Sequence, residues 1–176
     1  MSTRRGQTKQ FASVVLAFSV VLWSALAEEL PPAPKDYFND YAGVTSQATQ
    51  HALNERLAKF DKDTTDQVVA AIFPKMESTS SLDDYTLRVA NAWGVGQHGK
   101  NNGVTLFIFV QDHTMRIQVG DDLTGVLTDA LSKQILDRKL GPHFQRGDFD
   151  GGLTAAVDSM LKIIGGAASS DHLGSK

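Results

Sequence analysis

Residues 104–110 read VTLFIFV, and this stretch decides the fold. It is apolar at every position except Thr105, which is typical of a central strand that helices cover on both faces. The turn-forming residues 112–113 follow, and residues 115–119 then alternate between apolar and polar side chains. That alternation predicts a half-exposed strand, antiparallel to the first, so the two strands form a hairpin.

Upstream of the hairpin, the hydrophobic spacing predicts a helix that Ser46 caps and a short buried strand over residues 67–73. A second helix follows, capped by Ser81 and ended by Gly94. A right-handed crossover through this helix would make the first two strands parallel.

Downstream, Thr128 or Asp129 is expected to cap a third helix that runs through Leu136, and Asp148 opens a fourth. The predicted order is α, β, α, β, β, α, α. This order indicates the α/β class, as a three-layer α/β/α sandwich with a small mixed sheet.

The two ends of the chain are set aside from the predicted domain, residues 37–165. Residues 1–27 combine three cations with an apolar run that ends in Ala-Leu-Ala, the pattern of a signal peptide, with an uncleaved membrane anchor as the alternative. Residues 28–36 are a proline-rich lead-in, and residues 166–176 are expected to be a disordered polar tail. We therefore expect an exported protein, periplasmic or secreted, whose mature chain has no membrane span.

Charge and cysteine content exclude several classes of function. The chain has 17 Lys+Arg against 20 Asp+Glu, and without residues 1–27, which hold three of the cations and no acid, its formal charge is −6. Such a surface does not favour nucleic acid, and it suits cations better than polyanions. There is no cysteine, so disulfides, zinc–thiolate clusters and cysteine nucleophiles are excluded.

The predicted hairpin brings two polar loops together. Its second strand ends at Gly120, beside the start of the first at Gly103, so the loop over residues 94–103 faces residues 120–125 and the start of the third helix. Oxygen ligands that could meet there are those of Asp121, Asp122, Asp129, Asn101 and Asn102. This donor set predicts a site for Ca²⁺ or Mg²⁺, although turns and helix caps explain each acid taken alone.

Other motifs lead to no cofactor or catalytic centre. The glycines of residues 94–99 follow a helix and precede a strand, whereas a dinucleotide-binding loop follows a strand and opens a helix. The five histidines are scattered, without the spacing of a helical zinc motif. The serines at 78, 80 and 81 lack the setting of a nucleophile elbow, and turns or caps explain them.

Five segments in order give the chain a family resemblance. They are NDYAGV (39–44), WGVG with GKNNGV (93–104), RIQVG (116–120), LTD (127–129) and GDF (147–149). From about Tyr37 to Ile164 the chain resembles the TPM-domain family, which implies an exported or lumenal α/β/α sandwich. The resemblance also implies Ca²⁺ binding. The family includes a plant thylakoid-lumen member that is described as an acid phosphatase and linked to photosystem II repair.

One departure from the family pattern bears on metal binding. The segment after the hairpin usually reads Gly-x-Gly-Leu-Glu-Gly, whereas Thr124 stands here in place of the glutamate, and Asp121 and Asp122 offer the replacement charge. Three hypotheses follow. The first is a Ca²⁺-binding accessory or interaction module, with an envelope or membrane protein complex as its expected partner. The second is a metal-dependent phosphatase with Asp122 as catalytic base, and the third is a metal-free structural domain.

Overall fold

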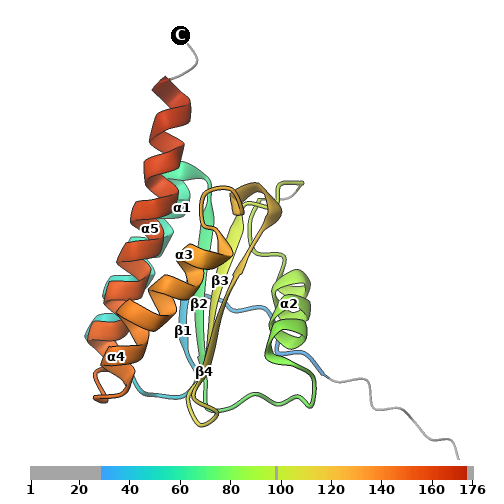
Figure 1. Ribbon diagram of the computed structural model, residues 1–176, viewed down its shortest axis with the longest axis vertical. Helices are drawn as coiled ribbons and strands as arrows, with labels where there is room; N and C mark the ends of the chain where they lie inside the picture. The colour runs from blue at the N-terminus through green and yellow to red at the C-terminus, as the bar shows by residue number, and fades with distance from the viewer. Residues whose placement is uncertain (1–28, 98, 174–176) are drawn as a thin grey trace, which may run out of the picture.

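A computed structural model describes residues 29–97 and 99–173, and it places helices on both faces of a central sheet (Figure 1). The strands are β1 (Phe38–Asp40), β2 (Gln67–Phe73), β3 (Gly103–Phe109) and β4 (Thr114–Val119). The longer helices are α1 (Gln47–Thr64), α2 (Leu82–Trp93), α3 (Asp129–Ile135) and α5 (Phe149–Leu173). The predicted α/β/α sandwich is confirmed.

The sheet has the order β1-β2-β3-β4, with the first three strands parallel and β4 antiparallel to β3. The predicted parallel pair and hairpin are therefore present, and Thr105 lies opposite Gln118 in the hairpin register. The sequence did not predict β1. Its three residues, Phe38 to Asp40, are too few for a period of two to show, and pairing with β2 makes them a strand.

Alternate residues of β3 face two separate hydrophobic clusters. Val104, Leu106 and Ile108 pack with α1, α3 and α5 on one face of the sheet. Phe107 and Phe109 pack with Tyr85 and Val89 of α2 on the other. Figure 1 shows this division, with α2 alone on its side of the sheet and the remaining helices opposite. Burial on both faces explains why β3 is almost wholly apolar.

The predicted helix caps are present. The side chains of Ser46, Ser81 and Thr128 each accept a hydrogen bond from a backbone N–H in the first turn of their helix. Gly94 ends α2 with a φ of 62°, a left-handed conformation that favours glycine. Thr128, rather than Asp129, is the capping residue of α3.

Two expectations about the helices require correction. The third helix is interrupted, because a π-helical segment η2 (Leu136–Leu140) separates α3 from a short helix α4 (Gly141–Phe144). The polar tail expected from residue 166 is not free of structure, since α5 continues to Leu173.

The lead-in is attached to the domain. Its residues 29–36 form no helix or strand, but Trp93 of α2 donates a 2.8 Å hydrogen bond from its indole nitrogen to the carbonyl oxygen of Pro31. The predicted signal peptide, residues 1–27, lies outside the described residues. No helix within residues 29–97 and 99–173 is both long and apolar enough to cross a membrane.

Candidate functional site

The two loops that the hairpin was expected to bring together are in direct contact. The Gly120 N–H donates to the carbonyl oxygen of Gly103 over 2.8 Å, and the Asp122 N–H donates to that of Asn101 over 3.2 Å. The side-chain amide of Asn101 also donates to Asp121 Oδ2 over 3.2 Å. Four of the five predicted ligand residues, Asn101, Asn102, Asp121 and Asp122, therefore belong to one junction, which we call the loop junction (residues 94–97 and 99–103 with 120–125).

Two glycines allow the loops to approach so closely. A Cβ on Gly103 would lie 2.0 Å from the carbonyl oxygen of Val95, and one on Gly120 would lie 2.1 Å from that of Asn101. These obstacles are backbone atoms, which cannot rotate away as a side chain can. Both positions therefore require glycine, and the loop junction is a rigid frame.

Asn102 belongs to this frame. It is 4% exposed, and its amide nitrogen donates to the carbonyl oxygen of Thr65 over 2.7 Å and to Asp66 Oδ1 over 3.1 Å. Its amide oxygen accepts from the N–H of Gln97 over 2.8 Å. The side chain thus links the loop to the end of α1 and the start of β2, and its oxygen is already engaged.

Asp129 lies apart from the loop junction. Its exposed side chain lines a groove beside β4 together with Arg116 and Lys133. Asp121 and Asp122 are both exposed, in the 3₁₀ turn η1 (Asp121–Leu123). Within residues 29–97 and 99–173 no three His, Asp or Glu side chains gather where they could hold a metal ion. The predicted ligand set is therefore only partly assembled.

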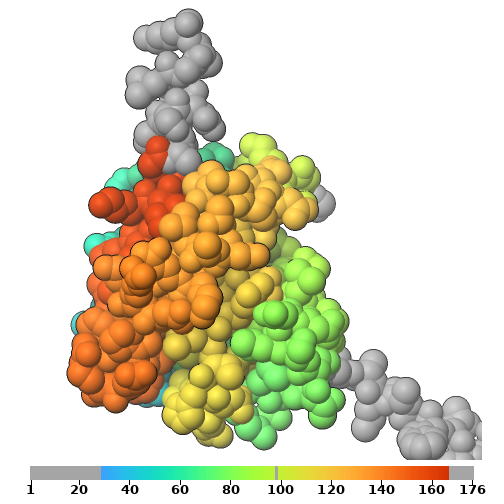
Figure 2. Space-filling view, viewed as in Figure 1, coloured from blue at the N-terminus to red at the C-terminus, as the bar shows by residue number. Residues whose placement is uncertain are grey.

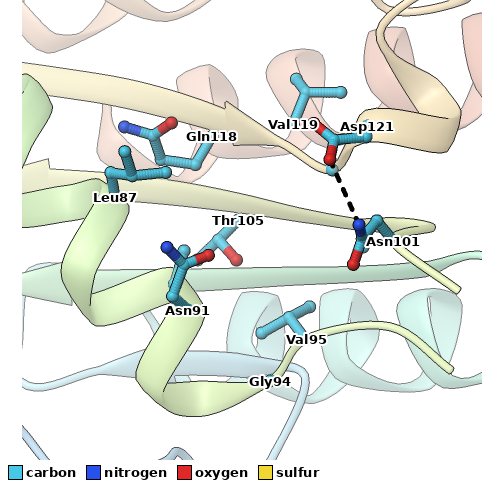
Figure 3. A pocket seen from close by; sticks show the side chains of 12 residues that line it. Leu87, Asn91, Gly94, Val95, Asn101, Thr105, Gln118, Val119 and Asp121 are labelled. Atoms are coloured by element: carbon cyan, nitrogen blue, oxygen red, sulfur yellow. Dashed lines mark hydrogen bonds between the residues drawn. The ribbon is translucent and has the colours of Figure 1, made fainter. Parts of the chain in front are cut away.

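The loop junction forms one end of a pocket of about 200 Å³ between α2 and the hairpin. Figure 3 shows Leu87 and Asn91 of α2 facing Thr105 and Gln118 of the strands, with the Asn101–Asp121 hydrogen bond at one end. Asp121 is the one charged side chain among the described residues of the lining. The other polar groups that line it are amides and a hydroxyl, all with oxygen as their acceptor atom.

Thr105 is the buried polar residue of this pocket. It is 1% exposed, and its hydroxyl has no hydrogen-bond partner among the described residues. Gln118, opposite it in register, donates its amide to the hydroxyl of Thr86 over 2.8 Å. Sequence reasoning missed Thr105, Gln118 and Asn91. One signal was available, since Thr105 interrupts an otherwise apolar strand and pairs with a polar residue in the predicted hairpin.

A histidine–aspartate pair lies elsewhere, at the start of α5. His143 Nδ1 is 2.7 Å from Asp148 Oδ2, and Asp148 Oδ1 accepts a hydrogen bond from the Gly151 N–H. The hydrogen bond with His143, followed by that with Gly151, lowers the pKa of Asp148. The sequence had predicted that Asp148 opens the last helix, and these bonds give it a capping role.

The fold and its loop junction together define a class, the small α/β/α sandwiches in which a hairpin closes a mixed sheet. The TPM-domain family profile matches residues 38–163, which is most of the chain, so the chain belongs to the TPM-domain family. No curated protein matches it significantly.

Solved structures share the fold. The N-terminal domain of a protein from P. gingivalis has a TM-score of 0.69 at 28% identity, covering 76% of this chain and 85% of that one. The N-terminal domain of the cg2496 protein from Corynebacterium glutamicum has a TM-score of 0.56 at 16% identity, covering 79% and 86%. The BA42 protein from the psychrophilic bacterium Bizionia argentinensis has a TM-score of 0.57 at 17% identity, covering 68% and 80%.

Proposed function

We propose that this TPM domain is an exported interaction module whose loop junction binds a divalent cation, with Ca²⁺ preferred to Mg²⁺. The observation that carries the proposal is the position of Asp121, the one charged side chain of the described pocket lining, beside Asn101 on a rigid frame. Asp121, Asp122 and the Asn101 amide oxygen would hold the ion. Asn102 and Asp129 are left out because the first is engaged in the frame and the second lines another groove.

The donor set fits a hard cation by its chemistry. Carboxylate, amide and hydroxyl oxygens line the pocket, and none of its described lining residues offers sulfur or imidazole. The amide of Asn101 now donates to Asp121, and a 180° rotation of that amide would turn its oxygen toward the same point. Because only two carboxylates contribute, we expect weak binding, with Kd of about 10⁻⁴–10⁻³ M, as in extracellular calcium modules.

Thermal unfolding of the protein in chelator, Ca²⁺ and Mg²⁺ tests the site. At ten times Kd, Ca²⁺ should stabilise the fold by about 1.4 kcal/mol, a rise in Tm of about 4 °C. The double variant Asp121→Asn with Asp122→Asn should lose the rise. Asp129→Asn, a matched removal of one exposed carboxylate, should keep it. A rise that survives the double variant, or no rise at all, would exclude this ligand set.

Interaction is favoured over catalysis because the described pocket lining contains no serine, histidine, lysine or arginine. A phosphatase needs a nucleophile or an activated water, and positive charge to receive the phosphate oxygens. The family resemblance nevertheless makes phosphatase activity the alternative. Hydrolysis of p-nitrophenyl phosphate, measured with Ca²⁺, Mg²⁺ or chelator, decides between the two. Cation-dependent turnover that the double variant abolishes would replace the module by an enzyme with Asp122 as its base.

Export is the remaining part of the proposal, and it rests on residues 1–27. Cleavage after Ala27 would leave a mature chain that begins at Glu28. Sequencing the N-terminus of the protein recovered from the cell envelope or the medium tests this. Recovery of the chain with Met1 intact in the membrane fraction would instead identify an uncleaved anchor.

A further inference from the structure

Strand β4 is at an edge of the sheet, and its outer side pairs with no other strand in the part of the chain that the structure describes. The Gly120 N–H donates to the carbonyl oxygen of Gly103. In an antiparallel ladder every second residue forms hydrogen bonds to the neighbouring strand, so Gln118 and Arg116, two and four residues before Gly120, are the residues bonded to β3. Met115 and Ile117 therefore direct their N–H and C=O groups outward. Among the described residues no hydrogen bond reaches either backbone N–H from that side.

A groove of about 340 Å³ runs along this edge. Residues 113–117 form its floor, and its walls come from helices on both faces of the sheet. Figure 2 shows the hollow, with β4 in yellow between the orange α3–α4 segment and the green α2. Each wall offers one leucine and at least one aspartate at the groove. The α2 side offers Leu82 and Asp83, and the side of α3 and η2 offers Leu136, Asp129 and Asp137.

Two side-chain groups of the groove are buried without a hydrogen bond to any described residue. They are the hydroxyl of Ser132, a residue 5% exposed, and Nε of Arg116. Arg116 Nε lies 3.1 Å from Asp83 Oδ1 as an ion pair, but the N–H is not aligned for a hydrogen bond. A buried polar group without a partner costs about 1–3 kcal/mol, so a ligand that supplies partners here gains more than the same contacts give in water.

We propose that this groove binds an extended polypeptide segment as a fifth strand, and that the segment carries lysine or arginine among apolar residues. Strand addition pairs the outward groups of Met115 and Ile117 with the backbone of the segment. The apolar residues of the segment contact the wall leucines. The inference is independent of the cation site, because none of the residues that would hold the ion lines this groove.

The charges that line the groove favour a basic segment over an acidic one. The described groove lining carries three aspartates against Arg116 and Lys133, and these two cations are already paired, with Asp83 and Asp137. Asp129 forms no ion pair among the described residues, so it is the acid that a lysine of the segment would reach. A second copy of this chain fits poorly, because its own β4 also lies between two helical walls that would meet those of the first copy.

Binding of synthetic peptides tests the proposal. The probe is an end-capped peptide of about seven alternating valines and lysines, long enough to span β4. It should bind to the full chain in a saturable manner, and it should slow amide hydrogen exchange at Met115 and Ile117 while leaving Arg116 and Gln118, already bonded to β3, unchanged. A valine–glutamate peptide should bind about fivefold more weakly.

Four controls make the result decisive. An N-methylated lysine peptide, which has lost the backbone donors that face the strand, should not bind. Asp129→Asn should remove the preference for lysine, and Asp121→Asn should leave binding unchanged, which separates this surface from the cation site. Met115→Pro should remove an outward N–H without breaking the ladder to β3. Equal binding by the N-methylated peptide, or exchange protection outside β4, or no saturation up to about 1 mM would overturn the proposal.

Discussion

Gly120 and Asn101 are packed so closely that a Cβ on Gly120 would lie 2.1 Å from the carbonyl oxygen of Asn101. Both residues belong to backbone that hydrogen bonds already hold, through Gly103 and Asp122. The contact between the loops therefore depends on the absence of a side chain at one position. It also places Asp121, the next residue, beside the Asn101 amide.

Gly120→Ala should destabilise the domain by about 2–3 kcal/mol, because a backbone segment has to move to make room for the methyl group. The corresponding fall in Tm is about 5–10 °C. Gly125→Ala is the matched control in the same loop, since its Cβ would meet nothing within 4 Å. Thermal unfolding of the two variants measures the difference. Equal melting temperatures would show that the loops separate at little cost.

Alanine substitutions at Asn101 and Asn102 should also differ in their effect on the free energy of unfolding. Asn102→Ala removes three hydrogen bonds at a buried position and leaves the Gln97 N–H and the Thr65 carbonyl without their partner, at an expected cost of about 1–3 kcal/mol. Asn101→Ala removes one exposed side-chain bond and should cost less than about 1 kcal/mol. Chemical denaturation compares them. If Asn101→Ala lowered the stability more than Asn102→Ala, it would be wrong to assign Asn102 to the structural frame and Asn101 to the ligands of the ion.

The different roles of these asparagines show where sequence reasoning stops. The hairpin, its register and the meeting of Gly103 with Gly120 follow from alternation over about twenty residues, a local signal. The role of Asn102 depends on Thr65 and Asp66, which a crossover brings beside it, and no local pattern shows that contact. The pocket has the same origin, because it exists only where α2 lies over β3 and β4.

Strand β1 and Asp129 show two further reasons why the sequence did not predict the whole structure. β1 is a strand because β2 pairs with it, and three residues carry no period of their own. Asp129 was expected near Asp121 because both follow the hairpin closely in sequence, yet the first turn of α3 directs it to the groove beside β4. Closeness in sequence predicted that Asp121 and Asp129 lie in the same region, whereas the direction of α3 determines which cavity Asp129 lines.

Acid should destabilise the domain partly through Asp148. The hydrogen bond with His143 lowers the pKa of this carboxyl in the folded state, so the unfolded chain takes up its proton at a higher pH. The contribution of ionised Asp148 to the free energy of unfolding is therefore present above the pKa of the unfolded chain, about 3.9, and is lost as the pH falls through the pKa of the folded state. Asp148→Asn keeps a capping side chain but cannot titrate. Its Tm should fall less than that of the wild type between pH 7 and pH values below about 4; parallel curves would contradict this role for the pair.

Thr86 and Thr105 provide the last comparison, because both are buried and only one hydroxyl is engaged. The Thr86 hydroxyl donates to the Leu82 carbonyl over 2.7 Å and accepts from Gln118 over 2.8 Å, whereas that of Thr105 has no partner among the described residues. Thr86→Val should therefore cost about 1–2 kcal/mol, and Thr105→Val should be neutral or stabilising. Denaturant unfolding measures both. If Thr105→Val also weakened the Ca²⁺-dependent rise in Tm, its hydroxyl would be assigned to the ligand set that the pocket presents, since the fold itself does not need it. A loss of stability in Thr105→Val as large as that in Thr86→Val would show that the Thr105 hydroxyl supports the fold.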